Sequence, residues 1–226
     1  GENEKLMYQF EDQGGREIGL RYDLTVPLAR VVAMHQEEVV LPFKRYHIAP
    51  VWRAEKPQRG RFREFWQCDA DIVGSASMIA DAEAVSIAAE ALTAVGLPNF
   101  VINISHRRLL EGIAISSGVD PKLAGSVYRA VDKLAKIGAN GVMKELGDSG
   151  IGADAARGVL DAVTKQGTPS QLLNELRPRM TSFEPGLKAI DELSDLFAIL
   201  PGLGVKETAY RLDLSLARGL DYYTGP

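Results

Sequence analysis

Positive charge gathers in one short stretch of the chain, between residues 44 and 64. This stretch holds seven lysines and arginines against two glutamates, whereas the whole chain of 226 residues has a formal net charge of −4. A single cationic segment therefore lies within an otherwise acidic protein. This distribution argues against a generic nucleic-acid binder and points to a local site for an anionic ligand.

Four residues around this segment have the types and the spacing that suit a nucleotide. Arg53 and Glu55 end one expected strand, and Arg61 and Phe65 open the next across a loop. A guanidinium group offers a planar fork of donors to phosphate oxygens. A glutamate can accept from an exocyclic amine, and a phenylalanine can stack on a purine. The alternative is a solvated hairpin with surface charges, which the order Arg-x-Glu, loop, Arg-x-x-x-Phe disfavours.

A second group of polar residues follows on the same expected strand. Gln67, Asp69 and Asp71 are spaced by two, so their side chains point to one face and indicate a polar pocket. Two carboxylates at this spacing could also ligate a metal ion, but we expect no metal site made by the protein alone. The histidines have no nearby serine, aspartate or cysteine partner pattern, which excludes a nucleophilic triad. We expect them to be structural or exposed: His35, His47 and His106.

The elements that must position these residues are two hairpins and a helix. Residues 43–54 and 62–73 read as long strands around a loop that contains Pro57 and Gly60. Residues 6–21 read as a shorter hairpin. Thr25 is expected to be the N-cap of the helix that follows, with Pro27 in its first turn.

The remainder of the chain is predicted to be mostly helical. An alanine-rich helix over 77–95 and a short strand over 100–104 precede a run of helices, and a last strand is expected over 208–216. We predict an α+β fold with a catalytic core in residues 1–119 and 185–226 and an inserted helical module in 120–184. The helices in the run are expected at 106–116, 121–137, 142–146, 153–165, 170–176 and 187–200.

Composition excludes several classes of protein. Apolar residues make up 46% and charged residues 25%, which is typical of a soluble globular domain. The single cysteine, Cys68, rules out an internal disulfide and a multi-cysteine zinc site, and we expect it to be a small buried hydrophobe. No apolar run reaches the roughly 18 residues of a membrane span, and we expect no signal peptide because residues 1–11 are polar and acidic. A cytoplasmic protein without a membrane partner is expected.

Three motifs together resemble the histidyl-tRNA synthetase family of class II aminoacyl-tRNA synthetases. They are LRYDLTVP at residues 20–27, RGRFREFWQCDAD at 59–71 and ARGLDYYTG at 217–225. The arginine-rich hairpin is similar to motif 2 of the class, and the last motif resembles the histidine-recognition signature. The resemblance implies a class II antiparallel β-sheet flanked by helices. It also implies ATP-dependent activation of L-histidine and its transfer to the 3′ end of tRNA(His).

The resemblance also assigns roles to residues of this chain. Arg53 and Arg218 would be catalytic, beside the α-phosphate, and Mg²⁺ would arrive with ATP. The ATP-binding residues would be Arg53, Glu55, Arg61 and Phe65. The histidine-binding residues would be Asp23, Leu24, Thr25, Arg53, Gln67, Asp71, Arg218, Tyr222 and Tyr223. Lys56 and Arg59, in the loop of the hairpin, would contact the acceptor end of the tRNA.

Three features of the family have no counterpart in these residues. Its motif 1, which builds a homodimer interface, would precede Gly1, and its motif 3 and anticodon-binding domain would follow Pro226. We therefore expect a longer homodimeric protein, and weak or no adenylation by the bare fragment. The alternative function is a synthetase-like regulatory subunit of ATP phosphoribosyltransferase, or another histidine-binding pseudo-enzyme. Such proteins often lose motif 2 or the histidine signature, whereas both are intact here.

Overall fold

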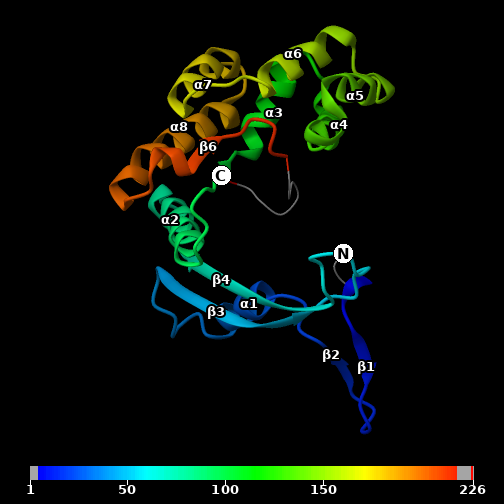
Figure 1. The fold of residues 1–226 in the computed structure, drawn as a ribbon, viewed down its shortest axis with the longest axis vertical. Coiled ribbons are helices and arrows are strands. Elements are labelled where there is room, and N and C mark those ends of the chain that lie inside the picture. The colour runs from blue at the N-terminus through cyan, green and yellow to red at the C-terminus, as the bar shows by residue number, and fades with distance from the viewer. Residues whose placement is uncertain (1–4, 218–224, 226) are drawn as a thin grey trace. The chain divides into compact units, whose positions relative to one another are not determined.

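The computed structural model describes residues 5–217 and 225 of the chain (Figure 1). The chain divides into two compact units, residues 1–76 and residues 77–226. The three residues Arg218, Tyr222 and Tyr223 of the expected histidine signature lie outside the described part.

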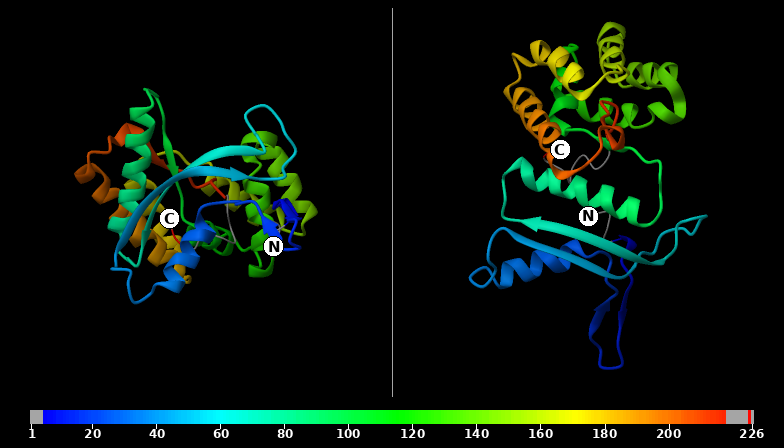
Figure 2. Two further views of the ribbon diagram at one scale, coloured as in Figure 1. Left: turned by 90° about the horizontal axis from the view of Figure 1, so that it is seen from below. Right: turned by 60° about the vertical axis from the view of Figure 1, so that its left-hand side comes forward.

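The first unit consists of two antiparallel hairpins and one helix. Its elements are β1 (Gln9–Glu11), β2 (Glu17–Gly19), α1 (Thr25–Met34), β3 (Phe43–Trp52) and β4 (Glu64–Val73). The β1–β2 hairpin projects away from the β3–β4 pair (Figure 2). Its turn is held by Asp12, whose carboxylate accepts from two backbone N–H groups and pairs with Arg16. These contacts lower the pKa of the Asp12 carboxyl. The two strand pairs confirm both predicted hairpins.

The β3–β4 pair presents two different faces because alternate side chains point to opposite sides. In its register, Arg45 lies opposite Asp71 and Val51 lies opposite Phe65. On one face, Ala49 and Val51 pack with Leu24 and Phe65 into a small core. We call this the inner face; it is the side on which the segment leading into α1 lies. The polar residues predicted for a pocket share this parity.

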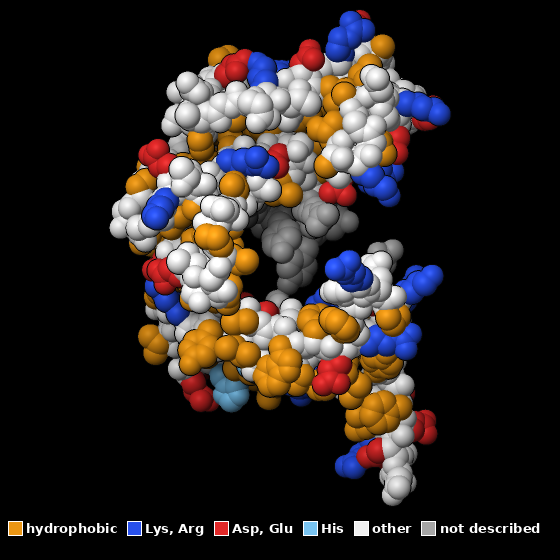
Figure 3. Space-filling model, in the orientation of Figure 1, with side chains coloured by type: hydrophobic (Ala, Val, Ile, Leu, Met, Phe, Trp, Pro, Cys, Tyr) orange, Lys and Arg blue, Asp and Glu red, His pale blue; other side chains and the backbone are white. Residues whose placement is uncertain are grey.

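The opposite, outer face of the same pair is exposed and apolar. Tyr46 and Trp66 are 79% and 69% exposed, and Figure 3 shows hydrophobic side chains on the surface of this unit. Cys68 lies on this face and is exposed. The expectation that Cys68 is buried is therefore wrong, because its parity on β4 is opposite to that of Gln67 and Asp71.

Helix α1 begins one residue earlier than the sequence predicts. Thr25 is its first helical residue and Leu24 occupies the N-cap position without a side-chain cap. Asp23 replaces that cap, since its Oδ1 accepts from the backbone N–H of Val26 at 3.0 Å. The prediction of Thr25 as N-cap is wrong because the carboxylate of Asp23, two positions upstream, already satisfies an otherwise unpaired donor of the first turn.

The second unit is a helical assembly with one short pair of strands. Its larger elements are α2 (Met78–Ala94), β5 (Ile102–Ile104), α3 (Arg107–Ser116), α4 (Ala124–Val131), α5 (Leu134–Asp148), α6 (Ala153–Val163), α7 (Pro169–Leu176), α8 (Glu184–Ile199) and β6 (Tyr210–Leu212). Short 3-10 helices lie at Pro121–Leu123 (η2), Arg177–Met180 (η3), Leu200–Leu203 (η4) and Glu207–Ala209 (η5). Helix α2 begins one residue after the predicted start at 77, because Ser77 is its N-cap and the Ser77 hydroxyl accepts from the N–H of Ile79.

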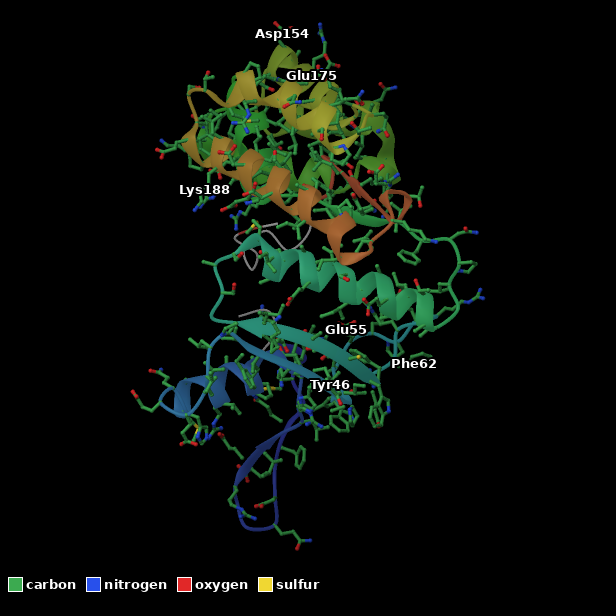
Figure 4. All side chains as sticks on the ribbon, turned by 90° about the vertical axis from the view of Figure 1, so that its left-hand side faces the viewer. Tyr46, Glu55, Phe62, Asp154, Glu175 and Lys188 are labelled. Carbon is green, nitrogen blue, oxygen red and sulfur yellow. The ribbon has the colours of Figure 1, made fainter. Side chains whose placement is uncertain are left out.

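One hydrophobic core joins the helices of this unit. Residues of α3, α4 and α6 pack with residues of α8, among them the fully buried Leu193 and Leu196. Charged residues such as Asp154 and Glu175 lie at the outer surface (Figure 4). The predicted inserted module, 120–184, shares this core with α8, and its status as a separate domain stays a prediction.

Two boundaries in this unit differ from the predicted ones. The helix expected over 121–137 is broken before Leu134, and the backbone of α5 leaves helical geometry at Gly138, where φ is +69°. Only glycine adopts this conformation without strain. The last strand is β6, shorter than the predicted 208–216, and it pairs in parallel with β5. The α+β class itself is confirmed. Among the described residues, no helix is long and apolar enough to cross a membrane.

Candidate active site

Arg53 is held at the end of β3 by contacts that fix both its backbone and its guanidinium group. Its backbone N–H donates to the carbonyl of Arg63 at 2.8 Å, which continues the ladder past the strand. Its Nε donates to the carbonyl of Tyr22 at 3.1 Å. The guanidinium carbon lies 4.5 Å from the Tyr22 ring centroid and 5.1 Å from that of Phe65. Two aromatic rings and one carbonyl thus orient a cation whose remaining donors can bind an anion.

The hairpin loop brings Glu55 and Arg61 into contact. Arg61 Nε lies 2.9 Å from Glu55 Oε2, and the Glu55 side chain is the more buried of the two. A tight turn closes the loop, since Gln58 and Arg61 exchange backbone hydrogen bonds and Gly60 has a φ of +75°. Glu55 and Phe62 are found at this end of the hairpin in Figure 4. Lys56 and Arg59, the predicted tRNA contacts, are both exposed.

Asp71 lies further along the inner face, in an ion pair that the sequence analysis did not anticipate. Arg45 Nε donates to Asp71 Oδ2 at 2.9 Å, and both side chains are largely buried. Arg45 Nη2 also donates to the carbonyl of Leu24 at 2.8 Å. Its Nη1 lies 3.2 Å from Nδ1 of His47. An arginine only donates, so His47 Nδ1 accepts and the ring proton resides on Nε2.

Gln67 occupies the middle of the same face with an unpaired acceptor. Its Oε1 is buried and has no hydrogen-bond partner among the described residues. An unpaired buried acceptor costs about 1–3 kcal/mol, which a donor on a ligand would recover. Next to it on this face, Asp69 is partly buried. Burial and the nearby charge of Asp71 raise the pKa of the Asp69 carboxyl, against the opposing charge of Arg45.

Asp23 and Thr25 lie at the start of α1. Asp23 uses Oδ1 for the Val26 N–H. Among the described residues, no hydrogen bond engages its Oδ2, so one carboxylate oxygen remains for a cationic ligand. Arg45 connects this segment to Asp71 through the carbonyl of Leu24.

The structure therefore brings Phe65, Gln67 and Asp71 to the inner face of one hairpin, with Arg53 at the end of its first strand. The other predicted site residues lie at the start of α1 (Asp23, Leu24 and Thr25) and in the hairpin loop (Glu55 and Arg61). Sequence reasoning missed the positioning contacts of Tyr22, Arg45 and His47. Strand parity could have placed Arg45 and His47 on this face, since each lies an even number of residues before Arg53. No group of three or more potential metal ligands is found among the described residues.

The fold and this hairpin define a class of protein. An α+β chain with Arg-x-Glu at the end of one antiparallel strand and Arg-x-x-x-Phe at the start of the next has the arrangement of the class II aminoacyl-tRNA synthetase fold. The profile of the family described as histidyl-tRNA synthetase matches residues 1–226 in full. The chain belongs to the histidyl-tRNA synthetase family.

Individual relatives agree with this assignment. Histidine--tRNA ligase of Gloeobacter violaceus is 40% identical over 99% of this chain and 53% of its own length. That of Aeropyrum pernix is 46% identical over 98% of this chain and 50% of its own length. The crystal structure of histidyl-tRNA synthetase from Nostoc sp. PCC 7120 is similar with a TM-score of 0.87 and 33% identity, over 97% of this chain and 50% of that one. The chain thus spans about half the length of the curated relatives it matches.

A further solved structure shares the fold at lower identity. It is described as an ATP phosphoribosyltransferase regulatory subunit/histidyl-tRNA synthetase from Bacillus halodurans C, with a TM-score of 0.81 and 23% identity over 97% of this chain and 56% of that one. At this identity the similarity concerns the fold alone.

Proposed function

We propose that the protein activates L-histidine with ATP to form histidyl-adenylate and transfers the histidyl group to the 3′ end of tRNA(His). The observation that carries the proposal is the order in which polar and aromatic side chains follow one another along the inner face. Arg53 and Phe65 suit a nucleotide, and Gln67 and Asp71 beside them suit an amino acid. A site that joins these two ligands needs both halves on one surface.

The chemistry requires two anions to meet, since the histidine carboxylate attacks the α-phosphorus of ATP and pyrophosphate leaves. Arg53 would contact both the carboxylate and the α-phosphate and cancel their repulsion. Its guanidinium is already oriented by Tyr22 and Phe65, so little reorganisation is needed when charge builds up in the transition state. Arg218 would stabilise the same phosphate from the histidine signature.

The adenine and terminal phosphates would bind at the loop end of the hairpin. Glu55 would accept from the adenine amino group while Phe65 provides a ring for stacking. Arg61 would leave Glu55 and contact the terminal phosphates. Their ion pair includes a largely exposed Arg61, and exposed pairs contribute only about 0–1 kcal/mol, so the exchange is inexpensive. Mg²⁺ would be carried by the ATP phosphates.

The histidine substrate would bind at the other end of the inner face. The free Oδ2 of Asp23, the Leu24–Thr25 segment and the unpaired Oε1 of Gln67 would receive its ammonium group. Asp71 would lie in the same pocket, with Tyr222 and Tyr223 lining the imidazole slot. A pocket of buried polar groups rejects analogues strongly, because a wrong ligand leaves its groups unpaired.

The remaining partners follow from the family. The exposed Lys56 and Arg59 would contact phosphates of the tRNA acceptor end, which position the RNA without reading its sequence. The helical module, residues 120–184, is proposed as an insertion that approaches the acceptor stem. The full-length protein is proposed to be a homodimer.

Amino-acid-dependent pyrophosphate exchange on the full-length protein tests the proposal. Exchange is expected with histidine and not with the other amino acids, and Arg218→Ala should reduce adenylation by orders of magnitude while histidine binding falls less. A regulatory subunit would bind histidine without exchange, and that result would refute the proposed activity. The intact Arg53, Glu55, Arg61 and Phe65 favour the enzyme over this alternative.

A further inference from the structure

Arg45 joins two parts of the inner face, the strand β4 and the segment before α1. Its guanidinium reaches Asp71 on β4 at 2.9 Å, the Leu24 carbonyl before α1 at 2.8 Å and His47 on its own strand at 3.2 Å. Each of the three guanidinium nitrogens is used for a different acceptor. The side chain is only 17% exposed, so these contacts are made largely away from water.

This geometry fixes the place of Asp71. A buried carboxylate without a partner would be costly, and the Arg45 pair orients this one through Oδ2. Among the described residues, no hydrogen bond engages Oδ1 of Asp71. That oxygen is therefore left to a ligand, while the carbonyl of Leu24 is held at a fixed spacing on the other side of the guanidinium.

We infer that Arg45 is a positioning residue for amino-acid recognition, which sets the distance between Asp71 and the Asp23–Thr25 segment. The inference rests on the proposed function, because it needs these residues to bind histidine. Arg45 itself does not touch the substrate; it acts through Asp71 and the Leu24 carbonyl. A lysine could not replace it, since one ammonium group lacks the rigid fork that contacts three separate acceptors.

Steady-state pyrophosphate exchange on the full-length protein tests this role. Arg45→Met should raise the KM for histidine roughly ten- to hundredfold, the range of a lost charge-assisted hydrogen bond, with the KM for ATP almost unchanged. The KM of Arg45→Lys for histidine should lie between those of the wild type and Arg45→Met, because the ammonium group keeps the charge but not the fork. Arg16→Met is the matched control, because it removes a similar Arg–Asp pair from the exposed β1–β2 turn.

A double-mutant cycle separates positioning from a general loss of structure. If Arg45 acts through Asp71, then Arg45→Met in the background of Asp71→Asn should add little to the KM for histidine. Full additivity of the two effects would overturn the inference. Should Arg45→Met fail to fold, Arg45→Lys replaces it in the same cycle.

The pH dependence supplies a second readout that a structural role would not move. Asp69 faces Asp71, Asp23, Arg45 and His47, and Arg45 opposes the raised pKa of the Asp69 carboxyl. Removing this cation raises that pKa further, so the negative charge that Asp69 adds beside Asp71 and Asp23 is lost at a higher pH. Binding of the histidine ammonium group by Arg45→Met should therefore weaken at a higher pH than in the wild type. If Arg45→Met is active and both its KM for histidine and the acid limb of its pH profile match the wild type, the role of Arg45 is overturned and the proposed function stands. A wild-type protein with no histidine-dependent exchange would refute the proposed function and this role with it.

Discussion

His106 offers a stability prediction whose size follows from two contacts. Its side chain is 2% exposed, at the N-cap of α3. Nδ1 accepts from the backbone N–H of Arg108 at 3.1 Å, and Nε2 lies 2.9 Å from Glu192 Oε2 on α8. An accepting Nδ1 requires the neutral ring with its proton on Nε2, which then donates to the carboxylate. One histidine therefore caps a helix and ties it to a neighbouring helix.

The two contacts can be removed one at a time. Replacing a capping side chain by alanine costs about 1 kcal/mol, and losing a hydrogen bond to a charged group costs about 1.5–3 kcal/mol. His106→Ala should therefore lower the free energy of unfolding by about 2.5–4 kcal/mol. His106→Asn keeps an acceptor for the Arg108 N–H but cannot reach Glu192, so it should be about 1 kcal/mol less destabilising.

The pH dependence of the loss has a definite sign. Burial lowers the pKa of His106 below its ordinary value, despite the opposing effect of Glu192. The unfolded state therefore binds a proton near pH 6.5 that the native state does not. The contribution of His106 is fully present above that pH and is lost as the pH falls, by up to about 1.4 kcal/mol per pH unit.

Urea denaturation of the wild type and the two variants between pH 5.5 and 8, followed by circular dichroism, measures both effects. The difference between wild type and His106→Ala should shrink as the pH falls below about 6.5. The reasoning would be refuted by a loss under about 0.5 kcal/mol, the size of an ordinary surface substitution. A difference that does not change with pH would refute the assignment of a neutral buried ring.

Three further predictions concern the site and the packing of the helices. Arg53→Lys should lower kcat/KM for histidine-dependent exchange at least about a hundredfold, because it loses the planar fork; thermal unfolding should confirm that the variant is folded, and near-wild-type exchange would contradict the role. Glu55→Gln should raise the KM for ATP and leave the KM for histidine and the stability almost unchanged, since its partner Arg61 is largely exposed; kinetics with each substrate varied in turn measures this, and a changed KM for histidine would contradict it. Gly112→Ala should lower the free energy of unfolding by about 1–3 kcal/mol, because the new methyl group would overlap the buried Met180 side chain. Chemical denaturation measures this loss, and a stability equal to that of the wild type would contradict the close packing of Gly112 against Met180.

Much of the site could be read from the sequence because its residues are close together along the chain. The order Arg53, Glu55, Arg61 and Phe65 spans a single hairpin, whose strands were expected within about two residues of β3 and β4. The period of two on β4 also placed Gln67 and Asp71 on one face. The alanine-rich stretch was equally informative, since the helix expected over 77–95 is α2, Met78–Ala94.

Other features depended on contacts between residues far apart in sequence. Arg45 looked like one more charge of a basic segment, and its role appears only when β4 and the Leu24 carbonyl are placed against it. Likewise, Thr25 is a residue type that favours the N-cap position, but the carboxylate of Asp23 accepts from the free N–H group of Val26 instead.

The sequence by itself determined the candidate residues for the chemistry, since the residue types and their spacing of two along the strands place them on one face of an arginine-rich hairpin. The tertiary structure decided how those residues are held. Arg45 acquires its three acceptors, and His106 its carboxylate 86 residues away, only when the chain is folded. A hydrogen bond requires atoms within about 3 Å, and no local pattern encodes which distant atom will occupy that position.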